Sequence, residues 1–148
     1  MESVFSNKAL WVPAVVWCMA QILKVIIESI KDRRLNFSHL TTMGGMPSSH
    51  AALVCALATT IAVVYGVGSA LFAISAFFAI VVMYDAAGVR QTVSTQSTML
   101  NRIVDELFKG NPQFQQRMRE LIGHTKFEVA AGAILGIVMA FLLAWPWQ

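Results

Sequence analysis

Charged residues are scarce in this sequence, and the places where they are missing are informative. Only 13% of the 148 residues are charged, whereas 57% are hydrophobic. This balance excludes an ordinary soluble domain. Residues 9–23, 51–84 and 129–148 carry no charge at all. Because a helix needs roughly 20 mostly apolar residues to cross a bilayer, we predict an all-α polytopic membrane protein that forms one domain over residues 1–148.

The uncharged stretches predict four transmembrane helices. They are expected at about residues 9–30, 48–65, 68–88 and 126–145. The middle stretch is too long for one helix, and Gly66-Val67-Gly68-Ser69 at its centre is typical of a turn. In an alternative reading the first helix is a cleaved signal peptide. Only a weakly basic region precedes it, and the apolar run resumes after Lys24, so this alternative is the weaker one.

Cysteine is also scarce. Cys18 and Cys55 both fall inside predicted helices, and neither a disulfide framework nor a zinc-binding spacing is present. The sequence contains no internal repeat and no recognisable nucleic-acid-binding module. We therefore expect no nucleic-acid partner, although membrane lipids must contact such a chain.

The positive charges are distributed unequally between the two ends of the predicted bundle. Four spans place the 31–47 and 89–125 connections on one side and both termini on the other. On the connection side lie Lys31, Arg33, Arg34, Arg90, Arg102, Lys109, Arg117, Arg119 and Lys126, whereas the terminal side has only Lys8. The positive-inside rule makes the connection side cytoplasmic and the termini external. The expected location is a bacterial inner (plasma) membrane.

Two further patterns concern packing. Leu100, Ile103, Val104, Leu107 and Phe108 recur at helical spacing opposite polar residues, which predicts a short amphipathic helix lying in the membrane interface and ending at Gly110-Asn111-Pro112. Gly132 and Gly136 have a small-xxx-small spacing, which lets two helix backbones approach closely. This second pattern serves either internal packing or a homo-oligomer interface.

The stretch Gly44-Gly45-Met46-Pro47-Ser48-Ser49-His50 is the most informative motif. The two glycines permit unusual backbone angles, and Pro47 suits the first turn of a helix, in which Ser48, Ser49 and His50 would follow. A helix start favours an anion, so added hydroxyls and an imidazole predict a phosphate-binding site with a proton donor. Alternatively, the glycines form an ordinary loop and Ser48 only caps the helix.

A second histidine motif, Gly123-His124-Thr125-Lys126-Phe127-Glu128, precedes the last span. His124 and Glu128 are four residues apart, so in a helix they share a face and the carboxylate can orient the imidazole. That pair suits a histidine nucleophile or base. Thr125-x-x-Glu128 is also a capping box, which would place the same residues for structural reasons, and the two roles are compatible.

Lys24 and Asp85 lie near the ends of apolar helices, where unpaired charges are costly and are candidates for function. Lys24 could instead extend to the interface or pair with Glu28, and Asp85 could pair with Arg90. What favours a site is that many ionisable and hydroxyl residues reach the same membrane face. They are Lys24, Arg33 or Arg34, Ser48, Ser49, His50, Asp85, Arg90, His124 and Glu128.

These residues resemble the divergent branch of the type 2 phosphatidic acid phosphatase and haloperoxidase superfamily. The resemblance covers nearly the whole chain. It rests on Gly44 to His50, Asp85-Ala86-x-Gly88-Val89-Arg90, Gln96, Asn101, Gly123-His124-Thr125 and Glu128-Val129, which occur in that order. It implies a helical membrane enzyme that hydrolyses phosphate monoesters or diphosphates, often on lipids, through a phosphohistidine and without a metal or other cofactor.

The resemblance also implies roles for individual residues. His124 would be the nucleophile, Glu128 would orient it, and His50 would donate a proton to the leaving group. The phosphate-binding residues would be Lys24, Arg33 or Arg34, Ser48, Ser49 and Arg90, with Gly45, Asp85 and Gly123 in support. Two departures stand out. Lys24 and Arg33 are spaced more widely than in the superfamily, and Met118 occupies the position six residues before His124 where an arginine is expected.

Two functions follow as alternatives. The first is a membrane phosphatase acting on a lipid phosphate, an isoprenoid phosphate or another phosphate substrate. The second is a non-catalytic phospholipid-binding or scaffold protein that keeps the phosphate site. The missing arginine favours the binder, whereas the retained His50, His124 and Glu128 favour the enzyme. A transporter role would rest on the intramembrane charges alone.

Overall fold

The structure, a computed structural model, describes residues 6–33, 45–107 and 125–145. This part is helical apart from short turns and helix ends, and it contains no strand. The elements are α1 (Lys8–Asp32), α2 (Ser49–Tyr65), α3 (Ala70–Tyr84), the π-helical segment η3 (Asp85–Val89), α4 (Arg90–Leu107) and α6 (Lys126–Ala144). The predicted all-α membrane bundle is confirmed.

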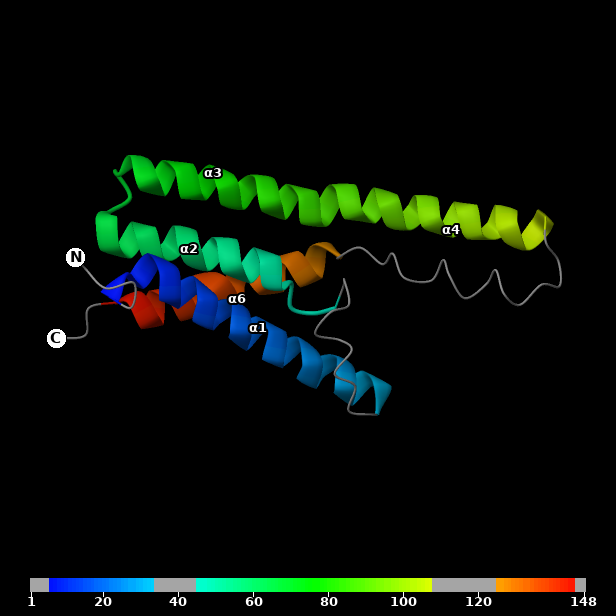
Figure 1. The fold of residues 1–148 in the computed structure, drawn as a ribbon, viewed down its shortest axis with the longest axis horizontal. Coiled ribbons are helices and arrows are strands. Elements are labelled where there is room, and N and C mark those ends of the chain that lie inside the picture. Colours follow the sequence, from blue (N-terminus) through cyan, green and yellow to red (C-terminus); the bar gives the residue numbers. More distant parts are fainter. Residues whose placement is uncertain (1–5, 34–44, 108–124, 146–148) are drawn as a thin grey trace.

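Helix α2 lies at the centre of the bundle and packs against α1, α3 and α6. The start of α1, the end of α6 and the α2–α3 turn lie at one end of the bundle, and the starts of α2 and α6 lie toward the other, as Figure 1 shows. At the terminal end, Lys8 Nζ donates a hydrogen bond to the Ala144 carbonyl oxygen over 3.1 Å. A cation at the negative end of α6 is a favourable arrangement, and it ties the first helix to the last.

Three of the four predicted spans are long and apolar enough to cross a membrane. They are Lys8–Asp32, Ala70–Gly88 and Lys126–Ala144. Helix α2 is equally apolar in character but has 17 residues, because Ser48 caps its start and Gly66, with φ of 83°, ends it. Seventeen residues reach about 26 Å, close to the thickness of the hydrocarbon core.

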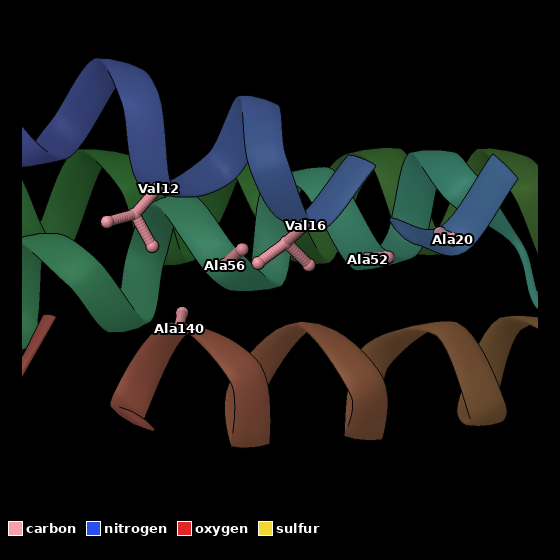
Figure 2. Packing of buried hydrophobic residues seen from close by; sticks show 6 residues of the cluster. All are labelled: Val12, Val16, Ala20, Ala52, Ala56 and Ala140. Carbon is pink, nitrogen blue, oxygen red and sulfur yellow. The ribbon is translucent and has the colours of Figure 1, made fainter. Parts of the chain in front are cut away.

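The centre of the bundle is packed by small side chains. Figure 2 shows Val12, Val16 and Ala20 of α1 facing Ala52 and Ala56 of α2 and Ala140 of α6. Where apolar surface meets lipid instead of water, helices associate mainly through such close van der Waals contact. Small residues at the contact therefore stabilise the bundle by letting the backbones approach.

Gly132 and Gly136 of α6 face the backbone of α2. A Cβ at Gly132 would lie inside van der Waals contact of the Ser48 carbonyl oxygen, and one at Gly136 would meet the Ala52 carbonyl oxygen in the same way. Of the two alternatives for this motif, internal packing is what the structure shows. Homo-oligomer formation itself stays a prediction, and it would need a surface other than these two glycines.

Helix α4 differs from the predicted short amphipathic helix in where it begins and how it is directed. It starts at Arg90 and continues α3 and η3 in one line that extends past the other helices (Figure 1). Neither a proline nor a turn motif separates Tyr84 from Leu107, so the chain has no cause to leave the helix. The amphipathic stripe is present, since Met99, Leu100, Ile103 and Leu107 are exposed. The predicted Gly110-Asn111-Pro112 end lies outside the described residues.

Candidate functional site

The start of α2 is shaped by Gly45 and Ser48. Gly45 has φ of 91°, which confirms the predicted unusual backbone angle. Ser48 is the N-cap, and its Oγ accepts a hydrogen bond of 3.4 Å from the Ala51 N–H. The prediction that Pro47 stands in the first turn is wrong, because the cap at Ser48 leaves Pro47 ahead of the helix. Ser48 and Ser49 are buried, whereas His50 is exposed in the first turn.

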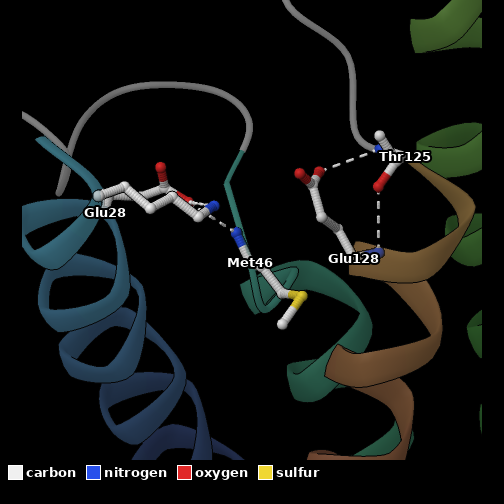
Figure 3. A network of polar contacts seen from close by, with 5 residues as sticks. Glu28, Met46, Thr125 and Glu128 are labelled. Atoms are coloured by element: carbon white, nitrogen blue, oxygen red, sulfur yellow. Dashed lines mark hydrogen bonds and ion pairs between the residues drawn. The ribbon is translucent and has the colours of Figure 1, made fainter.

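The start of α6 carries the capping box predicted as the structural alternative. Thr125 Oγ1 accepts a hydrogen bond from the Glu128 N–H over 3.3 Å, and Glu128 Oε2 accepts one from the Thr125 N–H over 3.0 Å. Both are drawn in Figure 3. The carboxylate of Glu128 therefore has a structural role, with which the predicted orienting role remains compatible.

The two helix starts are joined directly. The Ser48 N–H donates a hydrogen bond of 2.9 Å to the Glu128 carbonyl oxygen. Beside this bond, Ala51 of α2 and Val129 of α6 form a buried cluster with Ala86 of η3. Two motifs that lie far apart in the sequence thus meet, and each brings the positive end of a helix dipole to the same place.

Helix α1 contributes a buried lysine to this region. Lys24 is 5% exposed, and a Cβ at Gly45 would lie 3.0 Å from Lys24 Cε. The Lys24 ammonium interacts electrostatically with Glu28 of its own helix and with Glu128 of α6. The structure therefore brings Lys24, Gly45, Ser48 and Glu128 close to one another, and their role as a phosphate site stays a prediction.

Glu28 links α1 to the segment before α2, and sequence reasoning did not assign it to the site. Its Oε1 accepts a hydrogen bond of 2.8 Å from Lys31 Nζ and a long one of 3.5 Å from the Met46 N–H (Figure 3). It also flanks Gly45, since a Cβ there would lie 3.4 Å from Glu28 Oε1. The available signal was an acid in an apolar helix, four residues after Lys24 and three before Lys31.

The remaining predicted site residues either lie at the boundaries of helical segments or lie outside the described residues. Arg33 is exposed and ends α1 in a left-handed conformation, with φ of 51°. Asp85 is exposed at the start of η3, and Arg90 begins α4. Three of the predicted site residues, Arg34, Gly123 and His124, lie outside the described residues.

Together the fold and the site define a helical integral membrane protein in which a buried lysine, a capped helix start and a capping box meet near one end of the bundle. The chain belongs to the divergent PAP2 family, whose sequence profile matches residues 5–139. It is similar to the Bacillus subtilis (strain 168) protein YuiD, described as an uncharacterized membrane protein. The two are 39% identical over 137 residues, which covers 85% of this chain and 87% of the relative. No solved structure matches the chain.

Proposed function

We propose that this protein is a membrane phosphatase that hydrolyses a lipid or isoprenoid phosphate monoester or diphosphate through a phosphohistidine at His124. The observation that supports it most is the 2.9 Å hydrogen bond between the Ser48 N–H and the Glu128 carbonyl oxygen. That bond holds two helix starts beside the buried Lys24. Two helix dipoles and a lysine provide positive potential for a phosphate group.

In the proposed reaction, an imidazole nitrogen of His124 attacks phosphorus and the bond to the leaving oxygen breaks. His50 donates a proton to that oxygen, so the alcohol or phosphate leaves neutralised. Water then attacks the phosphohistidine, His50 accepts the proton, and inorganic phosphate departs. Lys24 and the helix N–H groups stabilise charge on the phosphoryl oxygens, which is the main source of catalysis in phosphoryl transfer.

The proposal places the site on the cytoplasmic side of a bacterial inner membrane, because the connections near the site carry most of the cations. A cysteine introduced as Arg102→Cys, in a chain without Cys18 and Cys55, shows on which side of the membrane this end of the bundle lies. A membrane-impermeant maleimide is expected to label it only after the cells are permeabilised. Labelling in intact cells would reverse the proposed orientation.

The experiment that tests the function is phosphate release by detergent-purified protein from phosphatidate, phosphatidylglycerophosphate, a polyprenyl diphosphate and a soluble phosphate ester. Lys24→Met and Lys31→Met form a matched pair, since both lysines are near Glu28 but Lys24 is buried and Lys31 is exposed. Because a hydrogen bond to a charged group contributes about 1.5–3 kcal/mol, Lys24→Met is expected to lower kcat/KM roughly 10- to 100-fold. Lys31→Met is expected to stay within about two-fold, because exposed ion pairs contribute little.

Release from none of the four substrates would overturn the phosphatase proposal. An equal loss of kcat/KM in both lysine variants would instead show that Lys24 has no specific role in binding the phosphate. Thermal unfolding in detergent shows whether each variant is folded.

Glu128 offers a way to separate capping from positioning. Glutamine also completes a capping box, so the free energy of unfolding of Glu128→Gln is expected to lie within about 0.5 kcal/mol of the wild-type value. That of Glu128→Ala is expected to be lower by about 1 kcal/mol. If the carboxylate orients His124, phosphate release falls about 100-fold or more in both variants. Full activity in Glu128→Gln would restrict Glu128 to its structural role. Release and chemical unfolding are measured on the same preparations.

One observation favours the second candidate, a non-catalytic phospholipid-binding protein. Ser48 Oγ and the Glu128 carboxylate both take part in helix capping, so both have a role that needs no turnover. Incubation with a substrate carrying labelled phosphate distinguishes the two functions. The enzyme is expected to yield an acid-labile labelled protein, whereas a binder retains label only as intact lipid.

A further inference from the structure

A hollow beside the start of α6 is not used by the proposed reaction. It is open, has a volume of about 630 Å³, and is lined by Tyr84, Ala87, Gly88, Thr92, Thr95 and Lys126. These residues come from the end of α3, from η3, from α4 and from the start of α6. Its volume is within the range of ordinary ligand-binding pockets.

The residues that line this hollow differ from those that form the region around Ser48 and Glu128, and Ala87 also packs against the cluster of Ala51, Ala86 and Val129 beside that region. Lys126 and Glu128 are two residues apart in α6, which turns their side chains about 200° from each other around the helix axis. The backbone of Glu128 contacts the start of α2, whereas Lys126 lines the hollow with η3 and α4. A ligand in the hollow would thus be held by different residues from a phosphate bound beside Lys24.

The lining of the hollow changes in character at the end of a membrane span. Tyr84, Ala87 and Gly88 belong to the apolar span Ala70–Gly88, whereas Thr92 and Thr95 lie beyond it. Lys126 is at the start of another span. The hollow therefore has one wall at the depth of acyl chains and another at the depth of headgroups.

The hollow has an open apolar wall and a polar wall that carries a cation. Tyr84 is 76% exposed, and a Cβ at Gly88 would have Tyr84 Cε1, 4.0 Å away, as its nearest neighbour. The apolar wall is therefore open to an incoming chain. Lys126 supplies a cation and Thr92 and Thr95 supply hydroxyls, of which Thr92 Oγ1 donates to the Gly88 carbonyl oxygen over 3.2 Å. Tyrosine and lysine at this depth are typical of contacts with lipid headgroups.

We propose that this hollow binds an anionic phospholipid. Its phosphate lies against Lys126, beside Thr92 and Thr95, and its acyl chain lies along Tyr84 and Gly88. The proposal is independent of the proposed function, because lipid retention requires no turnover and none of the lining residues has a part in the proposed reaction.

The test is native mass spectrometry of the full chain released from nanodiscs that contain equal amounts of phosphatidylglycerol and phosphatidylcholine. The wild type is expected to retain phosphatidylglycerol preferentially. Lys126→Gln is expected to weaken that retention about ten-fold, and Lys126→Arg is expected to preserve it. Gly88→Leu, which fills the hollow without changing charge, is expected to reduce retention of both lipids.

Arg102→Gln is the matched control, since Arg102 is exposed on α4 outside the hollow, and it is expected to retain lipid as the wild type does. Inorganic phosphate at millimolar concentration is expected not to displace the lipid. Equal retention of both lipids by the wild type, wild-type retention in Lys126→Gln and Gly88→Leu, or displacement by inorganic phosphate would each overturn the proposal. Phosphate release is measured separately, so the lipid-retention result can be interpreted even if the protein releases no phosphate.

Discussion

His124→Ala is expected to abolish formation of the labelled phosphoprotein and to lower phosphate release by at least about 10³-fold, because no nucleophile remains to accept the phosphoryl group. His50→Ala is expected to be slower by about 10²- to 10⁴-fold, the usual contribution of a general acid. His50 lies exposed in the first turn of α2, where its imidazole is accessible to a leaving group. Single-turnover release and labelling are measured for both variants.

Substrates with different leaving groups distinguish the roles of the two histidines. A lipid alkoxide needs a proton to depart, whereas p-nitrophenolate does not. On p-nitrophenyl phosphate, His50→Ala is expected to recover most of the wild-type rate, and His124→Ala is expected to recover none. A labelled adduct in His124→Ala would assign the nucleophile elsewhere, and an equal deficit of His50→Ala on both substrates would remove its role as general acid. Circular dichroism checks that both variants keep their helices.

The charge pattern predicted the helix bundle well, because the bilayer imposes the strongest constraint on this sequence. Stretches without charge coincide with α1, with α2 and α3, and with α6. Gly66 ends α2 as expected from the turn motif. Lys24 became a candidate because an ammonium in an apolar helix is costly without partners and because other polar residues reach the same membrane face. The structure places it beside Gly45 and Glu28.

The links between helices were less accessible to sequence reasoning. The hydrogen bond from Ser48 to Glu128 joins two backbone groups. Because nearly every residue has the same backbone groups, a pattern of side chains cannot predict which of them will bond. Glu28 looked like a partner for Lys24, because i, i+4 spacing describes one helix and not its neighbours. The start of α4 was placed too late because periodicity locates an apolar stripe, whereas the helix itself continues from α3 through residues with weak periodicity.

Gly132→Ala is expected to destabilise the fold strongly. Alanine normally favours a helix over glycine by about 1 kcal/mol, so α6 considered alone would gain stability. In the bundle the new Cβ would meet the Ser48 carbonyl oxygen and lie 3.1 Å from the Ser48 carbonyl carbon and 3.2 Å from Ala51 Cβ. Carbonyl atoms of a helix backbone have little freedom to move aside. The helices must separate, at a cost of about 1–3 kcal/mol or more.

Gly68→Ala is the control for glycine replacement, since nothing lies within 4 Å of a Cβ at that position, and it is expected to leave the unfolding midpoint nearly unchanged. Gly136→Ala is the control for position. Its Cβ would press on the Ala52 carbonyl group, one turn further along α2, so its loss of stability should match that of Gly132→Ala. Midpoints are compared by thermal unfolding in one detergent.

The difference between the two packing glycines connects stability to the site. Separation of α6 from α2 at Gly132 pulls directly on the residue whose N–H bonds to the Glu128 carbonyl oxygen. At Gly136 the strain falls deeper in the bundle. Phosphate release is therefore expected to fall further in Gly132→Ala than in Gly136→Ala at temperatures where both are folded. Equal activities would mean that the Ser48–Glu128 contact tolerates displacement, and an unchanged midpoint in Gly132→Ala would contradict the close approach of the two helices.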